Sequence, residues 1–206
     1  MCYEHNVVCT LTLLARKSDP TENIIGETTI SGQVHAAAGL NWGYSSGRPS
    51  IEHAYIPVRK SNILEYSQLF EKNNPINIIW DDGTTMTLLS EQNGPSIGDG
   101  IQYGKALSTY GNKSILGDYL RNRIGNEIGR NLIFSEYTIN TLAEIKKINS
   151  GNKDSIIEEI QNNNILLQEL NEKFITLNDL QQYGRTDISV SLLENGIYYF
   201  DFSVNE

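Results

Sequence analysis

The sequence predicts a mostly β fold with flanking helices, arranged as an open and mostly antiparallel sheet or barrel. Three observations predict it. Short apolar, β-branched runs recur along the chain, and turn dipeptides such as Asp82-Gly83 and Asn195-Gly196 join pairs of them. Few of these runs are separated by a helix. Because parallel strands need a crossover connection that is usually helical, this order disfavours a doubly wound fold.

The first third of the chain alternates short strands with long polar segments. Residues 7–15 are β-branched and apolar, as is typical of a strand, and a polar stretch follows to about residue 39. Residues 39–53 are rich in Gly, Ser and Asn and carry aromatic side chains, so they predict a loop of the kind that often has a function. Residues 54–58 predict a short strand, which Pro57 confines to an edge or an end of the sheet.

The middle of the chain predicts a helix and a hairpin. Residues 61–70 have a helical apolar spacing, with Ser61 as the expected N-cap. The elements expected after this helix are strand 76–80, turn 81–83, strand 84–89, a glycine-rich loop at 90–104 and strand 105–109. Residues 114–124 then predict a basic amphipathic helix that ends at Gly125.

The last third predicts a helical insertion followed by a hairpin. Apolar residues recur at helical spacing between about 131 and 173, with a capping box expected at Ser155 and a polar interruption at 161–164. Residues 187–193 and 197–204 predict two strands joined by the Asn-Gly turn. We therefore expect one domain over residues 1–206, with the insertion at about 131–173.

The overall charge permits DNA binding but does not favour it. The chain has 206 residues and a formal net charge of -9, yet residues 101–130 carry five basic and two acidic groups. Only the local field matters within a Debye length of about 8–10 Å, so a neutral or basic face can coexist with an acidic one. No apolar run is long enough to span a bilayer, and the first residues lack a signal-peptide pattern. Two cysteines, Cys2 and Cys9, indicate reduced thiols. We expect a cytoplasmic protein with no membrane partner.

The sequence indicates no catalytic, metal or cofactor site. His5, His35 and His53 form no ligand pair, and the two cysteines lack companion metal ligands. Two Gly-x-Ser-x-Gly matches, at 43–47 and 94–98, lie in loops instead of between a strand and a helix. The paired carboxylates Asp81 and Asp82 have two interpretations, a magnesium site or a hairpin turn, and the turn is favoured. We expect no cofactor and no activity from this chain on its own.

Three ordered segments resemble one known family. They are Gly39-Leu-Asn-Trp-Gly-Tyr-Ser-Ser-Gly-Arg48 leading into residues 54–58, residues 104–109 followed by 112–125, and residues 175–188 ending in 198–203. All three resemble the C-terminal half of NgoFVII-type and BfiI-type restriction endonucleases. That half is similar to the DNA-binding pseudobarrel of plant B-three transcription factors. The resemblance covers residues 7–130 and 174–204, and it implies an open antiparallel pseudobarrel.

The resemblance also implies a mode of DNA binding. In the family, two loops grip the major groove, and they correspond here to about residues 35–53 and 90–104. The family's nuclease domain, which is phospholipase-D-like, cuts with a His-x-Lys motif that this chain lacks. The resemblance therefore implies a recognition domain of a restriction endonuclease without a catalytic centre of its own.

The chemistry of the two loops suits this function. Arg48 can form two hydrogen bonds to guanine, and amide, carboxylate and imidazole side chains can pair with other base edges. The expected base-reading residues are Asn41, Trp42, Tyr44, Arg48, Glu52, His53, Glu91, Gln92, Asn93 and Gln102. The expected phosphate-binding residues are Arg59, Lys60, Lys105, Lys113, Arg121 and Arg123.

Some of these residues have a second interpretation. Trp42 is also a candidate anchor packed on the core, and Arg185 with Asp187 is a candidate structural pair. Arg121 and Arg123 lie two apart on a helix and cannot share a face, so we expect only one of them to touch DNA. Tyr44, Glu52 and His53 depart from the residues usual in the family, so the target sequence is not carried over.

The sequence leaves three candidate functions for this chain. The first is sequence-specific binding of double-stranded DNA. The second is a subunit or interaction module of a restriction system that docks a nuclease partner through the acidic helical insertion. The third is an enzyme with a site that the motifs do not reveal.

Overall fold

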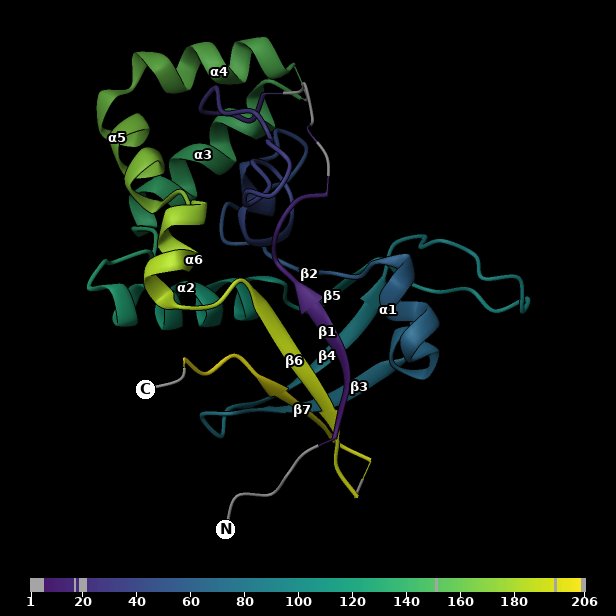
Figure 1. Ribbon diagram of the computed structural model, residues 1–206. Helices are drawn as coiled ribbons and strands as arrows, with labels where there is room; N and C mark the ends of the chain where they lie inside the picture. The colour runs from purple at the N-terminus through teal and green to yellow at the C-terminus, as the bar shows by residue number, and fades with distance from the viewer. Residues whose placement is uncertain (1–5, 17, 19–21, 151, 195, 205–206) are drawn as a thin grey trace. The chain divides into compact units, whose positions relative to one another are not determined.

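The computed structural model describes the chain except residues 1–5, 17, 19–21, 151, 195 and 205–206. Cys2, His5 and the Asn195 position of the expected turn lie outside the described residues. The chain divides into two compact units (Figure 1). The barrel unit comprises Met1–Leu13, Ile56–Asn112 and Gly184–Glu206, and the helical unit comprises Leu14–Tyr55 and Lys113–Tyr183.

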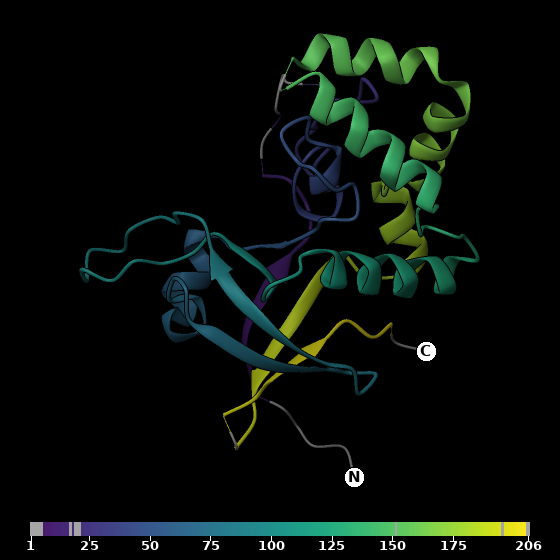
Figure 2. The ribbon, with the colours of Figure 1, turned by 180° about the vertical axis from the view of Figure 1, so that it is seen from behind.

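The barrel unit is built on one mixed sheet. Its strands, as far as the chain is described, are β1 (Val7–Thr12), β2 (Ile56–Pro57), β3 (Pro75–Trp80), β4 (Thr85–Glu91), β5 (Ala106–Thr109), β6 (Asp187–Leu192) and β7 (Tyr198–Asp201). They pair in the order β1-β6-β7-β3-β4-β5-β2. Every pairing is antiparallel except β3 with β7, in which Ile78 lies opposite Tyr198. The outermost strands β1 and β2 also lie near each other, so the sheet is nearly closed (Figure 2). The predicted pseudobarrel fold is confirmed.

The interior of the barrel unit follows from the two-residue period of its strands. Ile76, Ile78 and Trp80 alternate with more exposed residues along β3 and are buried. Trp80 meets Phe200 of β7 edge to face, with ring centroids 5.4 Å apart. Helix α1 (Lys60–Glu65) and the 3-10 helix η2 (Ser67–Phe70) add further apolar side chains, and the Asn62 amide donates to the Thr10 carbonyl at 2.7 Å. These contacts join the ends of the sheet to a common core.

The hairpin between β3 and β4 explains the two adjacent aspartates. Asp82 Oδ1 accepts a hydrogen bond from the Thr84 backbone at 2.9 Å, and Asp81 Oδ1 accepts one from the Phe202 backbone at 2.9 Å. Gly83 has φ +85°, which a residue with a side chain rarely adopts. Asp82 therefore stabilises the turn, in agreement with the favoured interpretation, and Asp81 ties the end of β3 to the segment after β7.

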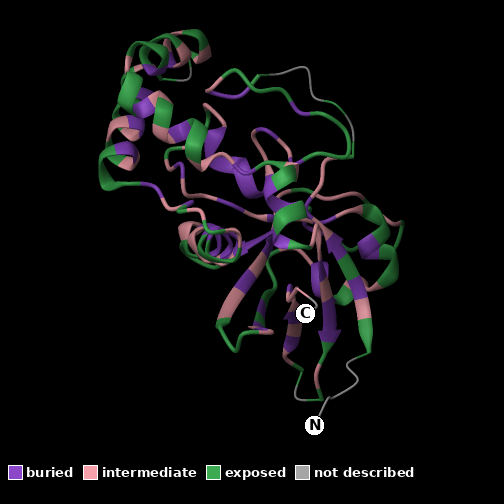
Figure 3. Cartoon of the chain, turned by 60° about the vertical axis from the view of Figure 1, so that its left-hand side comes forward, coloured by how far each residue is buried: buried purple, intermediate pink, exposed green. Residues whose placement is uncertain are grey.

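The helical unit contains the 3-10 helix η1 (Gly39–Tyr44) and helices α2 (Ser114–Ile128), α3 (Glu136–Ile148), α4 (Lys153–Asn162), α5 (Asn164–Lys173) and α6 (Leu177–Tyr183). Its core mixes residues from both sequence segments: Ile24, Tyr44 and Ile51 pack with Leu142, Ile145, Ile156, Ile160, Leu166 and Leu170. Figure 3 shows the buried stripes along these helices. Helices α3–α5 therefore share one core with residues 24–51, a feature that periodicity did not reveal.

Several predicted helix ends are wrong. Helix α1 begins after Arg59 instead of Ser61, because the Asn62 side chain accepts from the Arg59 backbone at 2.9 Å. Helix α4 is capped by Asn152, whose side chain accepts from the Ser155 backbone. Helix α2 runs past Gly125 to Gly129, which has φ +67°.

Two further differences concern whole elements. The sequence missed α6, a helix of only seven residues. It also predicted a loop at 39–44, where η1 is wholly buried. None of the described helices has the length and apolar character required to cross a bilayer.

Candidate nucleic-acid interface

The first loop, defined as residues 35–53, is closed on itself by backbone hydrogen bonds. The Gly43 N–H donates to the His53 carbonyl at 3.0 Å, and the Tyr55 N–H donates to the Gly39 carbonyl at 3.2 Å. A Cβ atom at Gly43 would lie 1.9 Å from the Ile51 carbonyl oxygen, so only glycine allows this close approach. The loop therefore has a defined shape before any ligand arrives.

Asn41 and Tyr44 hold the loop to the helices instead of facing outward. The Asn41 amide exchanges two hydrogen bonds with the Ile175 backbone, at 2.8 and 3.2 Å. The Tyr44 hydroxyl donates to the Leu170 carbonyl at 2.7 Å, and burial raises the pKa of this phenol. Both side chains are fully buried. Neither has surface left to touch a base in this structure, and we remove both from the base-reading set.

Trp42 anchors a group of cations. Its ring is only 6 % exposed and meets Tyr55 edge to face at 5.0 Å. The Arg48 guanidinium lies 4.2 Å from the ring centroid and the Lys113 ammonium 5.1 Å from it. Aromatic faces attract cations, so Trp42 orients both side chains. The buried position of Trp42 agrees with its second interpretation, an anchor packed on the core.

His53 and Glu52 lie beside these cations at the end of the loop. Burial, followed by the charges of Lys113 and Arg48, lowers the pKa of His53. At neutral pH its ring is therefore neutral and offers one donor and one acceptor. The Glu52 carboxylate accepts from the Ser50 hydroxyl at 2.9 Å. Arg48, Glu52 and His53 are all half-buried, which leaves part of each side chain accessible.

The second loop, defined as residues 90–104, belongs to the barrel unit and connects β4 to β5. Two backbone hydrogen bonds close the base of this loop. The Gly94 N–H donates to the Tyr103 carbonyl at 2.8 Å, and the Lys105 N–H donates to the Glu91 carbonyl at 2.9 Å. Asn93 is exposed and accepts from the Lys72 ammonium at 2.7 Å. A hydrogen bond between Asp99 and Tyr103 holds the tip.

The other candidates of the second loop differ in accessibility. Gln102 is exposed, and Gln92 is half-buried with φ +61° at the end of its strand. The Glu91 carboxylate accepts from the Ser108 hydroxyl at 2.7 Å. Asn93 and Gln102 also line an open cavity of about 290 Å³. The amides Asn93 and Gln102 are therefore the best placed of the expected base readers in this loop.

The expected phosphate contacts separate into exposed and internal cations. Lys60 and Lys105 are exposed and Arg59 is half-buried, all in the barrel unit. Arg123 is half-buried and donates to the hydroxyls of Tyr183 and Tyr119, both at 2.8 Å. Its guanidinium is thus engaged within the helical unit.

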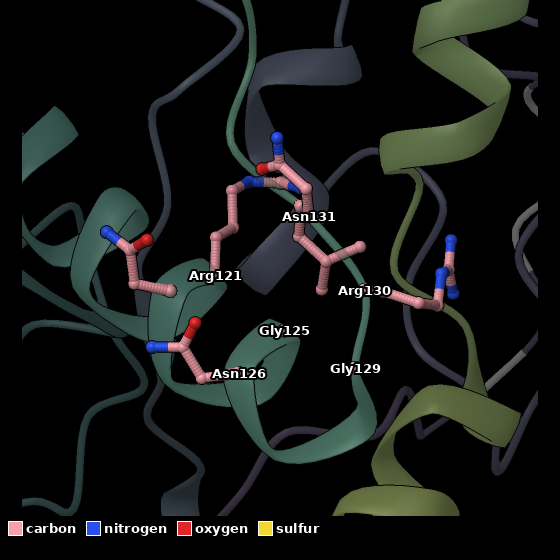
Figure 4. Close-up of a pocket in the computed structure, with 8 residues that line it drawn as sticks. Arg121, Gly125, Asn126, Gly129, Arg130 and Asn131 are labelled. Atoms are coloured by element: carbon pink, nitrogen blue, oxygen red, sulfur yellow. The ribbon is translucent and has the colours of Figure 1, made fainter.

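Arg121 is an internal residue. It is 1 % exposed, donates to the carbonyls of Lys173 and Leu40, and lies 4.7 Å from the Phe134 ring. It borders a pocket at the C-terminal end of α2 (Figure 4). Two of its guanidinium nitrogens already donate to backbone carbonyls, and the side chain is shielded from solvent. Arg121 is therefore removed from the phosphate-binding set.

Sequence reasoning missed Lys146. Its ammonium is buried and donates to the Gly43 carbonyl of the first loop at 2.7 Å. Burial, and then the charge of Arg48, lowers its pKa to about 7. The only signal was a lysine pair at the end of a predicted helix, and lysines in such a position are more often exposed to solvent.

The expected pair of Arg185 with Asp187 is present at 3.3 Å. Within the described residues, no three or more His, Cys, Asp or Glu side chains gather to hold a metal ion.

A nearly closed seven-stranded sheet with a long polar loop between β4 and β5 defines the pseudobarrel class of fold. Comparison with known families agrees with this class. The model of the NgoFVII C-terminal B3-like DNA-binding domain matches residues 3–142, more than half of the chain, so the chain belongs to that family. It is a DNA-binding domain of the restriction-endonuclease recognition type. The matched residues include both loops, whereas β6 and β7 lie beyond them. No curated protein matches the chain.

Proposed function

We propose that this chain reads a specific sequence in double-stranded DNA through both loops, as the target-recognition domain of a restriction endonuclease. The observation that most directly supports this proposal is the group of cations at the first loop. Arg48 and Lys113 are gathered over Trp42 in a chain whose net charge is -9. Concentrating positive charge at one loop of an acidic protein raises the local attraction for a polyanion.

The proposed base contacts follow from the accessible side chains. In the first loop, Arg48 donates two hydrogen bonds to guanine, while the neutral His53 ring and the Glu52 carboxylate pair with neighbouring base edges. In the second loop, the amides of Asn93 and Gln102 read the major groove, with Gln92 and Glu91 beside them. Each good contact contributes about 1–3 kcal/mol of discrimination between bases.

The proposed phosphate contacts set the position of the domain without reading sequence. Lys60, Lys105 and Arg59 serve this role on the barrel unit, and Lys113 serves it on the helical unit. Arg123 is a weaker candidate for a phosphate contact, because two tyrosine hydroxyls already accept hydrogen bonds from it. Backbone contacts of this kind give affinity for all duplexes.

Selection of bound sites from a random duplex library, with and without methylated bases, tests the proposal. We expect one enriched sequence and binding that weakens steeply with salt. Arg48→Ala should relax the preference at one base pair, and Lys105→Ala should weaken binding to every duplex alike. A library without any enriched sequence would refute sequence-specific reading. A uniform effect of Arg48→Ala would refute the assignment of the first loop to base reading.

A second candidate function is docking of a nuclease partner through the helical segment. It is favoured by Ile148 and Ile165, which are 74 % and 67 % exposed, and by the exposed acidic residues Glu158 and Glu159 of α4. Deleting residues 135–172 cannot separate the two functions, because those helices share a core with Tyr44 and Ile51.

Charge reversal at Glu158 and Glu159 separates them without opening the core. Under the docking proposal, this variant loses association with a nuclease polypeptide while its DNA affinity does not fall, because the added positive charge can only favour DNA. Intact association after charge reversal would count against the acidic face as the docking site.

A further inference from the structure

A cavity of about 360 Å³ opens where the first loop meets the end of helix α3. Its lining from the loop is Ser46, Gly47, Arg48 and Pro49, and its lining from the helix is Ala143, Lys146 and Lys147. All of these residues belong to the helical unit. The ionisable groups among them are Arg48, Lys146 and Lys147, and no carboxylate of the described residues lines the cavity.

The charges around this cavity repel one another. The charge of Arg48, after burial itself, contributes to the lowered pKa of Lys146. The Arg48 Nε atom is buried and has no hydrogen-bond partner in the part of the chain that the structure describes. An unpaired buried donor is costly, and so is a set of like charges without a counter-ion. A bound anion would relieve both costs.

The dipole of α3 accounts for only part of this arrangement. Lysines are favoured in the last turn of a helix, where Lys146 and Lys147 lie. The dipole does not account for Arg48 on the facing wall of the cavity. It also does not account for the orientation of Lys146, whose ammonium points to the Gly43 carbonyl at 2.7 Å.

We propose that this cavity is a binding site for a phosphate group of the DNA backbone, contacted by Lys147. Lys146 lies beneath the loop and holds Gly43 in place through its hydrogen bond to the Gly43 carbonyl, and Arg48 adds positive charge. Lys147 is exposed and can reach a ligand without rearrangement of the core. Both lysines lie beyond residue 142, where the match to the family model ends. The inference rests on the proposed function, because it requires the first loop to face DNA.

Salt-dependent binding of the full chain to its selected duplex tests the site. Each phosphate neutralised contributes about 0.9 to the slope of log K against log salt concentration. We expect Lys147→Ala to reduce the slope by about 0.9 and to weaken binding several-fold for all duplexes in equal proportion. Lys147→Arg should restore the slope. Lys153→Ala is the matched control, because Lys153 is on the next helix and does not line the cavity.

The outcomes separate this inference from the proposed function. If Arg48→Ala relaxes one base preference while Lys147→Ala leaves the slope unchanged, the proposed function stands and the phosphate site is refuted. If no sequence is enriched, the proposed function fails whatever the slope. A thermal melt with added inorganic phosphate distinguishes free phosphate from DNA as the ligand. If phosphate raises the melting temperature of the unsubstituted chain but not of Lys147→Ala, and the slope is unchanged, the cavity takes free phosphate and not DNA.

Discussion

Replacement of Lys146 by methionine should remove a specific pH dependence from the stability of the helical unit. Lys146 is buried, and its pKa falls from 10.5 to about 7 on folding. Between these values the unfolded chain binds more protons than the folded chain, so the free energy of unfolding rises with pH. The burial penalty is therefore complete below about pH 7 and is relieved as pH rises toward 10.5.

The magnitude follows from the size of the shift. One pKa unit corresponds to about 1.4 kcal/mol, so the whole window is worth about 5 kcal/mol at most. Between pH 7 and 9 we expect the chain with Lys146 to gain about 2 kcal/mol relative to Lys146→Met, because the buried lysine is already half deprotonated at pH 7. Methionine has a similar length and no charge, so the variant retains most of the packing.

Urea unfolding at several pH values measures this difference. Trp42 lies in the helical unit and Trp80 in the barrel unit, so fluorescence of a Trp80→Phe background reports the helical unit alone. Cys9 and Tyr198 also have raised pKa values, but both proteins carry them, so they cancel in the comparison. Parallel stability curves for the two proteins between pH 7 and 9 would refute a lysine that loses its proton on burial.

Three further predictions concern the same unit. Tyr44→Phe leaves the Leu170 carbonyl without its buried donor, so chemical denaturation should show a loss of about 1–3 kcal/mol. Burial, and then the charge of Glu52, raises the pKa of Asp118 to about 6, so between about pH 4 and 6 the folded chain holds a proton that the unfolded chain has lost. The free energy of unfolding therefore falls as pH rises through this window. Asp118→Asn should therefore stabilise the chain above pH 6 but not below pH 4, which thermal melts at both values will show. Deletion of residues 135–172 should expose Tyr44 and Ile51 and unfold the first loop, and an unchanged protease-resistance pattern around residues 35–53 would contradict this.

The strands were predictable because a two-residue period and turn dipeptides are local signals. The hairpin from β3 to β4 was predicted with its turn because Asp82-Gly83 fits the tight geometry there. The edge position of β2 followed from Pro57, which cannot donate to a neighbouring strand. The pairing of β3 with β7 was not predictable, because it joins segments more than a hundred residues apart and leaves no local pattern.

The candidate site was predicted less well than the fold. Arg48, His53 and the amides of the second loop were found by residue type, and they are at least partly accessible. Asn41, Tyr44 and Arg121 were chosen by the same reasoning, yet all three are buried and bonded to backbone carbonyls. A polar side chain has the same letter whether it meets a base or a carbonyl, so residue type alone does not distinguish the two.

The sequence by itself determined the class of fold, the positions of the two loops and the resemblance to restriction-endonuclease recognition domains. Periodicity, turn chemistry and ordered motifs are local properties, and they survive without coordinates. Only the tertiary structure decided which loop residues are accessible, and it alone placed Lys146 beneath Gly43. The physical reason is burial: packing between distant segments determines which polar groups are satisfied internally and which remain available for DNA.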